Sequence, residues 1–288
     1  MSKLSKVQAL QNQEKTQPTQ DRLPKVQEVI DRVGISGLRT GLKLCGNSGE
    51  TCFTAEIDLF IDLSDQRKGI HMSRLVESIN EVVSRESIES KQSFEQIGMD
   101  ILSDLKNRHK YSRGEITIKT TMLMRRHTPV SNKPTDEPYD VTIGVGTKGA
   151  GDGHSASDSF YKKLRVRAIG NTLCPHSLET TKGKAHVQRA EVDLEIEAPI
   201  KEKIPLEELI EICENSFSSP TYTVLKTPDE AAVVEEMFRN PKFVEDVARD
   251  CLRQAKNLKF KGKARIRATS FESIHKHNAV SEIERVFR

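Results

Sequence analysis

Two kinds of apolar pattern follow each other along the first half of this chain, and their order restricts the folds that it can adopt. Residues 53–63 and 115–124 alternate between apolar and polar side chains, which is typical of strands with one buried face. Between them, residues 72–83 and 93–107 place apolar side chains at the spacing of amphipathic helices. The sequence therefore predicts a sheet, two helices and a return to the sheet.

The second half of the chain repeats this order. Residues 163–169 and 189–197 have the pattern of strands, a helix is expected to begin near Pro205, a second helix covers residues 243–252, and residues 261–269 alternate again. Strands, two helices and strands thus occur twice, which predicts an α+β fold with an internal duplication. No sequence identity at a fixed period accompanies the repeated pattern.

Composition and periodicity divide the chain into four expected segments. Residues 1–22, rich in Gln, Lys, Ser and Thr, are expected to form a disordered leader. A first module over residues 23–145 and a second over residues 161–288 are separated by a Gly/Ser-rich linker or insertion at residues 146–160. The glycines at 144–153 could also cradle a phosphate, but the Gly-Lys-Ser/Thr ending of a phosphate loop is missing.

Composition excludes several classes of protein. The chain has 288 residues, of which 35% are hydrophobic and 30% charged, and it contains neither a membrane-length apolar run nor the apolar core of a signal peptide. Its five cysteines are scattered, which fits a reducing compartment, so a cytoplasmic location without disulfides is expected. A net charge of only +3 and the lack of Trp argue against a nucleic-acid partner, while the small basic excess suits an anionic substrate.

A thiol and an imidazole flank a short loop in the second module. Cys174 begins the sequence Cys-Pro-His-Ser, and His186 follows twelve residues later. With Glu230 and Glu272 they could hold zinc or ferrous iron and leave one coordination position for water, as in a catalytic metal site. The spacing fits no zinc finger, and the alternative is a turn with a buried cysteine.

Several motifs, in one order, resemble those of a known enzyme family. They are Lys68-Gly-Ile-His-Met-Ser-Arg, Thr128-Pro-Val-Ser, Cys174-Pro-His-Ser, His186-Val-Gln-Arg, Leu225-Lys-Thr-Pro-Asp-Glu, Asn240-Pro-Lys-Phe-Val-Glu-Asp and Phe271-Glu-Ser-Ile-His-Lys-His. They are similar to segments of the GTP cyclohydrolases of the archaeal methanopterin pathway and of the related bacterial type IB enzymes. The resemblance covers nearly all of the chain after the leader.

This resemblance implies a tunnelling fold, in which two tandem modules each carry an antiparallel sheet with two helices on one face. Subunits of such proteins join their sheets into a barrel, so we expect a homodimer or homotetramer with sites near the subunit interfaces. The implied reaction is the hydrolytic opening of the guanine imidazole ring of GTP, in which water activated by a divalent metal attacks carbon 8 and the carbon leaves as formate. No nucleic acid or membrane partner is implied.

The methanopterin branch implies Fe2+, with Mn2+ or Zn2+ as alternatives. Its products would be pyrophosphate and 7,8-dihydroneopterin 2',3'-cyclic phosphate, for tetrahydromethanopterin-type or folate-type pterin biosynthesis. The alternative is the type IB reaction, which gives 7,8-dihydroneopterin triphosphate. A second alternative, from another class, is a non-catalytic protein of the same fold that binds purines or pterins.

The resemblance also assigns roles to individual residues. It implies that Cys174 and His186 are metal ligands, that Glu230 is a candidate third ligand, and that Glu272 is a further ligand or a base that orients water. Cys174, His186 and Glu272 are therefore the implied catalytic residues. The candidate substrate-binding residues are Glu245, for the N–H edge of guanine, and His71, Arg74 and Arg189, for the phosphates.

Each role has a structural alternative. Glu245 could belong to a solvated helix face, Glu230 could favour a helix start through the helix dipole, and His71 could cap a helix. His176 departs from the Cys-Pro-Cys that the family often has. If the second cysteine is a ligand, His176 could replace it and shift the metal preference toward nitrogen; if it is structural, catalysis is unchanged.

Overall fold

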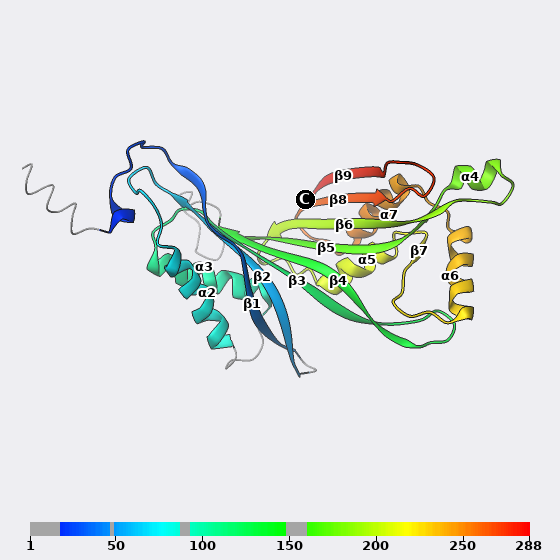
Figure 1. Cartoon of the computed structure of the whole chain (residues 1–288), viewed down its shortest axis with the longest axis horizontal. Coiled ribbons are helices and arrows are strands. Elements are labelled where there is room, and N and C mark those ends of the chain that lie inside the picture. The colour runs from blue at the N-terminus through cyan, green and yellow to red at the C-terminus, as the bar shows by residue number, and fades with distance from the viewer. Residues whose placement is uncertain (1–17, 47–48, 87–92, 148–159) are drawn as a thin grey trace, which may run out of the picture. The chain divides into compact units, whose positions relative to one another are not determined.

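The computed structural model describes residues 18–46, 49–86, 93–147 and 160–288 (Figure 1). The expected leader therefore lies outside the described residues except for residues 18–22, and so do residues 148–159 of the expected linker. The chain divides into two compact units, one made of Met1–Ile118 with Gly144–Phe160 and the other of Lys119–Ile143 with Tyr161–Arg288. The two are called the first and the second unit below.

The first unit contains a long antiparallel strand pair and two helices. A short 3-10 turn, η1 (Thr19–Asp21), precedes β1 (Ile30–Gly46) and β2 (Gly49–Leu63), which pair antiparallel. Helices α2 (Met72–Glu86) and α3 (Phe94–Arg108) pack against each other, and α2 contacts β1 (Figure 1). Strands β3 (Gly114–His127) and β4 (Pro134–Thr147) contribute residues to both units and continue the order β1-β2-β3-β4.

The apolar periodicity explains why these elements form. Alternate residues of β2 are buried, and so are the apolar stripes of the two helices; these residues are Ala55, Ile57, Leu59, Ile61, Leu75, Ile79, Ile97, Ile101, Leu102 and Leu105. Helix α3 begins at Phe94 because the hydroxyl of Ser93 accepts a hydrogen bond from the Gln96 N–H at 3.2 Å. Both predicted strands and both predicted helices of the first half are confirmed.

The second unit holds the remaining strands and helices. Its strands follow the order β3-β4-β5-β6-β8-β9, with β7 paired to β5, and the pairs β5–β6, β6–β8 and β8–β9 are antiparallel. The elements are β5 (Phe160–Leu173), α4 (Pro175–Thr180), β6 (Val187–Pro199), α5 (Leu206–Glu214), β7 (Ser219–Pro220), α6 (Thr227–Arg239), α7 (Val244–Ala255), η3 (Lys256–Leu258), β8 (Gly262–Ser270) and β9 (Ala279–Phe287).

Helix α7 is the centre of the second unit's core. It packs against β6, β8 and β9, and α5 packs against both α7 and β6 (Figure 1). The buried apolar side chains of this unit include Leu164, Val166, Val192, Leu194, Ile196, Leu209, Ile210, Val247, Ala248, Cys251, Ala264 and Ile266. The predicted repetition of strands, two helices and strands is confirmed, with α4, β7 and α6 as additions to the second round.

None of the described helices is long and apolar enough to cross a membrane.

Candidate functional site

The loop between β5 and β6 brings Cys174 beside His186. Strand pairing ends at Leu173 and Val187, and the backbone N–H of Cys174 then donates to the carbonyl of His186 at 3.3 Å. Cys174 is the N-cap of α4, with Pro175 in the first turn, and its sulfur accepts a hydrogen bond from the Ser177 N–H at 3.4 Å. The half-buried thiol is thus held at the end of the sheet, adjacent to the imidazole-bearing residue.

Gln188 fixes the imidazole of His186. His186 and Gln188 are two residues apart in the extended segment that leads into β6, so their side chains point to the same side. His186 Nδ1 lies 2.9 Å from Gln188 Oε1. The amide nitrogen of Gln188 faces Thr172 Oγ1 at 3.1 Å and the carboxylate of Glu272 at 3.5 Å. Because a carboxylate only accepts, this amide nitrogen is the donor, so Gln188 Oε1 accepts from Nδ1–H and the Nε2 lone pair of His186 stays available to a ligand.

Glu272 lies on the Nδ1 side of the same imidazole. Its Oε2 is 3.9 Å from His186 Nδ1, and it follows β8, the neighbour of β6 in the sheet. Ser270, at the end of β8, accepts from the Gln188 amide at 3.2 Å. The ends of β6 and β8 therefore bring His186 and Glu272 together at Gln188, whose role the sequence did not indicate, and the end of β5 holds Cys174 against the backbone of His186.

A metal ion would find suitable donor types here. A thiol, an imidazole with an available Nε2 and a carboxylate suit a divalent first-row ion. In the part of the chain that the structure describes, no group of three or more His, Cys, Asp or Glu side chains is gathered tightly enough to hold one. The assignment of Cys174, His186, Glu230 and Glu272 as ligands therefore stays a prediction.

Of the two adjacent carboxylates at the start of α6, Asp229 is buried and Glu230 is exposed. Asp229 accepts hydrogen bonds from the backbone N–H groups of Val130 at 2.9 Å and Ser131 at 2.8 Å, from the Ser131 hydroxyl at 2.6 Å and from the Lys226 N–H at 3.0 Å. Burial opposes ionisation, but these donors outweigh it and hold the pKa of Asp229 well below its usual range. Asp229 joins the Thr-Pro-Val-Ser turn to the helix on which Glu230 lies.

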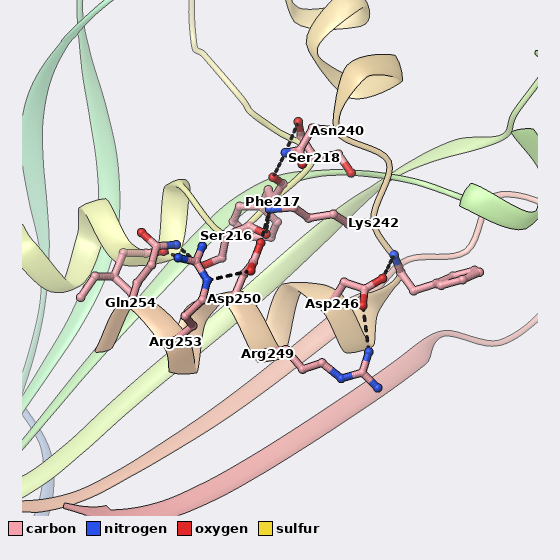
Figure 2. Close-up of polar contacts among 12 residues, drawn as sticks. Ser216, Phe217, Ser218, Asn240, Lys242, Asp246, Arg249, Asp250, Arg253 and Gln254 are labelled. Carbon is pink, nitrogen blue, oxygen red and sulfur yellow. Dashed lines mark hydrogen bonds and ion pairs between the residues drawn. The ribbon is translucent and has the colours of Figure 1, made fainter. Parts of the chain in front are cut away.

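Glu245, the candidate guanine anchor, is exposed in the first turn of α7. The helix start is fixed by its neighbour Asp246, whose Oδ2 accepts from the Phe243 N–H at 3.2 Å, and Arg249 Nη1 lies 2.8 Å from Asp246 Oδ1 (Figure 2). A carboxylate at a helix N-terminus is favoured by the helix dipole. Glu245 is thus an accessible acceptor on a fixed turn.

Two of the phosphate candidates, His71 and Arg74, belong to a cationic cluster in the first unit. Arg67 and His109 are its other members. Carbonyls of η1 and of the residue after it accept hydrogen bonds from the backbone N–H groups of residues 68 and 69. This brings Asp21 to 3.4 Å from His71 Nε2 and 3.7 Å from Arg67 Nη1. Arg74 Nη1 donates to the Arg108 carbonyl at 3.0 Å.

His109 completes this cluster, although no sequence pattern pointed to it. Its ring centroid is 6.5 Å from that of His71, and its buried Nε2 has no hydrogen-bond partner among the described residues. Burial lowers the pKa of His109, and the positive charges of Arg67 and Arg74 lower it further. The cluster thus gathers two arginines and two imidazoles, with the carboxylate of Asp21 as a counter-charge beside Arg67 and His71.

The other candidate side chains lie at the surface of the second unit. Arg189 is exposed on β6, and its carbonyl accepts from the Phe271 N–H at 2.9 Å. His176 is exposed on α4, which leaves both interpretations of the Cys-Pro-His departure open. The exposed rings of His275 and His277 stack with their centroids 5.3 Å apart, in the segment after Glu272.

The chain is similar to proteins of one enzyme family over most of its length. The family model described as type I GTP cyclohydrolase folE2 matches residues 17–281. GTP cyclohydrolase MptA of Thermococcus kodakarensis is 48% identical and GTP cyclohydrolase MptA of Pyrococcus furiosus is 45% identical; each alignment covers 92% of this chain and at least 97% of the relative. GTP cyclohydrolase FolE2 of Dictyoglomus turgidum is 34% identical over 89% of this chain and 93% of its own length.

Among solved structures, uricase from Arthrobacter globiformis is similar with a TM-score of 0.56, covering 92% of this chain and 96% of the uricase chain. At 6% sequence identity this likeness shows the fold alone. The fold is the predicted tunnelling fold, of mixed α+β class with antiparallel sheet and packed helices.

Proposed function

The chain belongs to the type I GTP cyclohydrolase family, and from that membership we propose that it opens the imidazole ring of GTP and releases carbon 8 as formate. Release of this carbon breaks both of its C–N bonds and consumes two water molecules. The observation that supports the proposal most directly is that His186 and Glu272 both contact the Gln188 side chain, at the end of the sheet where the backbone of Cys174 is hydrogen bonded to that of His186.

The residues of this arrangement suit a metal-assisted hydrolysis. A divalent ion held by Cys174, His186 and one or both of Glu230 and Glu272 would supply a water molecule that is deprotonated near neutral pH. The Gln188 amide holds the proton of His186 on Nδ1 and so keeps Nε2 as a donor for the ion. Glu272, if it is not itself a ligand, is placed to orient water or accept its proton.

Substrate binding is assigned to two groups of residues. The carboxylate of Glu245 can accept two parallel hydrogen bonds from the N–H edge of guanine, which would fix the orientation of the base. The cluster of His71 and Arg74, with Arg189 as a further candidate, would bind the phosphates. The lowered pKa of His109 favours its neutral form, so its buried imidazole would act there as a hydrogen-bonding group.

We further propose that the products are pyrophosphate and 7,8-dihydroneopterin 2',3'-cyclic phosphate, made with Fe2+ for a tetrahydromethanopterin-type or folate-type pterin. The support is the higher identity to two relatives named MptA, at 48% and 45%, than to relatives named FolE2, at 34%; another relative named MptA is 31% identical, so the product itself must decide between the two branches. The second candidate is the type IB product, 7,8-dihydroneopterin triphosphate, and Mn2+ or Zn2+ is the alternative ion.

The test is an anaerobic assay of metal-stripped protein with GTP, with each metal added back and the products identified by mass. The cyclic phosphate with Fe2+ is expected, and the triphosphate would instead assign the type IB reaction. Cys174→Ala should abolish turnover and metal binding with the fold intact, whereas the same substitution at the exposed Cys52 should change neither. Unchanged turnover in Cys174→Ala would remove this thiol from the site.

The proposed working form is a cytoplasmic homodimer or homotetramer with its sites near subunit interfaces. Mixing two inactive variants, Cys174→Ala and Arg74→Ala, tests this arrangement. Recovery of activity in the mixture is expected if one site uses residues from two subunits. A mixture that stays inactive, although its subunits exchange, would favour sites built within one chain.

A further inference from the structure

A buried lysine occupies the connection between α6 and α7. Lys242 is only 8% exposed, and its ammonium lies 2.6 Å from Asp250 Oδ2, on the second turn of α7. The same ammonium donates to the carbonyl of Ser216 at 3.0 Å (Figure 2). A buried charge is costly unless it is paired and hydrogen bonded, and this one is both.

The backbone of Lys242 is tied to the strand that leads to the thiol. Its N–H donates to the carbonyl of Leu173 at 3.1 Å, and the two residues form an isolated antiparallel bridge. Leu173 immediately precedes Cys174, and Lys242 is three residues before Glu245. One residue therefore joins the end of β5, which carries the thiol, to the start of α7, which carries the candidate guanine anchor.

The segment 216–218 connects the same two elements a second time. The side chain of Asn240 donates to the carbonyls of Phe217 at 3.0 Å and Ser218 at 3.2 Å (Figure 2). The Ser218 hydroxyl accepts from the Leu173 N–H at 3.3 Å, on the strand side. Gln254, at the end of α7, donates to the Ser216 hydroxyl at 3.3 Å.

Directional polar bonds differ from apolar contacts in what they specify. Apolar surfaces of similar volume can replace a buried ion pair with little loss of stability, but they allow a helix to shift along its neighbour. The Lys242 ammonium must satisfy a backbone carbonyl and a carboxylate of α7 at once, which sets the axial position of that helix. The pair therefore contributes geometry in addition to stability.

We propose that Lys242 and Asp250 are positioning residues, which set the carboxylate of Glu245 relative to Cys174 and so hold carbon 8 of guanine at the thiol–imidazole group. The inference rests on the proposed function. It predicts that loss of the pair lowers the rate of the chemical step more than the binding of GTP, because Glu245 can still bind guanine while its distance from the reacting centre changes.

The test compares the wild-type protein with the double variant Lys242→Met/Asp250→Leu, which removes both charges together and leaves neither of the two unpaired. The matched control is Lys263→Met/Glu284→Leu, which removes a surface ion pair of 2.9 Å between β8 and β9, outside α7 and the segment 216–218. The Lys242→Met/Asp250→Leu double variant should stay folded and keep its metal stoichiometry, with a melting temperature lowered by a few degrees because the buried carbonyl of Ser216 loses its donor. Its kcat should fall on the order of 10- to 100-fold while KM for GTP changes by less than about 3-fold.

A second readout does not depend on turnover. With cobalt(II) bound, the thiolate-to-metal absorption should change when GTP is added to wild-type protein and to Lys263→Met/Glu284→Leu, and this change should be smaller in the double variant Lys242→Met/Asp250→Leu. Wild-type protein that binds GTP without releasing formate would refute the proposed reaction but not the positioning. A folded double variant with wild-type kcat, or with a wild-type cobalt response to GTP, would overturn the positioning role.

Discussion

Replacing Gln188 with leucine should weaken metal binding without unfolding the protein. Gln188 is the acceptor for His186 Nδ1–H at 2.9 Å, and its amide nitrogen is 3.5 Å from Glu272. Leucine has a similar volume but offers no acceptor, so the imidazole loses its fixed tautomer and ring orientation. The hydroxyls of Thr172 and Ser270, which also contact the amide, lie 3.2 Å apart and can still hydrogen bond to each other.

Of the four hydrogen bonds that leucine cannot make, those to His186 and Glu272 set the size of the effect on the metal. The hydrogen bond to a neutral imidazole contributes about 0.5 to 1.5 kcal/mol net. Release of Glu272 from the same amide adds a term of similar size, so the total is about 1 to 3 kcal/mol, or roughly a 5- to 150-fold loss of metal affinity.

Competition with a chromophoric chelator measures the affinity of each variant for Zn2+ or Co2+, and thermal denaturation of the metal-free protein reports its folding. The same substitution at Gln96, on α3 in the first unit, is the control and should leave the affinity unchanged. A folded Gln188→Leu protein with wild-type affinity would refute the reasoning that this amide holds His186 for a metal.

Two further predictions concern stability. Burial opposes ionisation of Asp193, but hydrogen bonds from Arg167 and Arg165 lower the pKa of this carboxylate. Its contribution to stability is therefore complete above pH about 4 and is lost as the pH falls through the lowered pKa. Asp193→Asn should therefore cost about 1 to 2 kcal/mol at pH 7, reduced because the arginines are half-exposed, and less at pH 3; equal costs in denaturant unfolding at both pH values would contradict this. A methyl group at Gly170 would lie 2.2 Å from the Phe217 ring, so Gly170→Ala should cost about 1 to 3 kcal/mol. Gly41→Ala, which meets no atom within 4 Å, should be nearly neutral in the same melting experiment, and similar melting temperatures for the two variants would refute the packing argument.

The elements that the sequence predicts are those with a complete apolar pattern. β2 and α3 bury regular stripes, whereas β1 was not predicted because its register shifts between Ile35 and Leu38, around Gly37 at φ +74°. α6 was missed for a different reason: of its residues only Asp229 and Met237 are buried, so no apolar stripe marks it. Edge strand β9 shows charged and half-buried residues in place of an apolar face.

The residues of the candidate site also differ in how far the sequence predicts them. Cys174 and His186 meet because a short loop joins two adjacent strands, which their spacing in the sequence allows. Gln188 and Lys242 act through partners on other strands and helices, and those pairings depend on the assembled sheet. Nor could the sequence tell that Asp229 is turned inward and the adjacent Glu230 outward, because the hydrogen-bonding turn at residues 128–131 is almost a hundred residues away.

The central claim is that this chain removes carbon 8 of GTP, and isotopic labelling tests it most directly. GTP carrying carbon-13 at position 8 is incubated anaerobically with the Fe2+-loaded protein, and the products are followed by carbon-13 NMR. We expect one labelled formate for each GTP consumed, and none with Cys174→Ala. Consumption of GTP with the label retained in the purine, or no consumption with any of the metals, would contradict the proposed function.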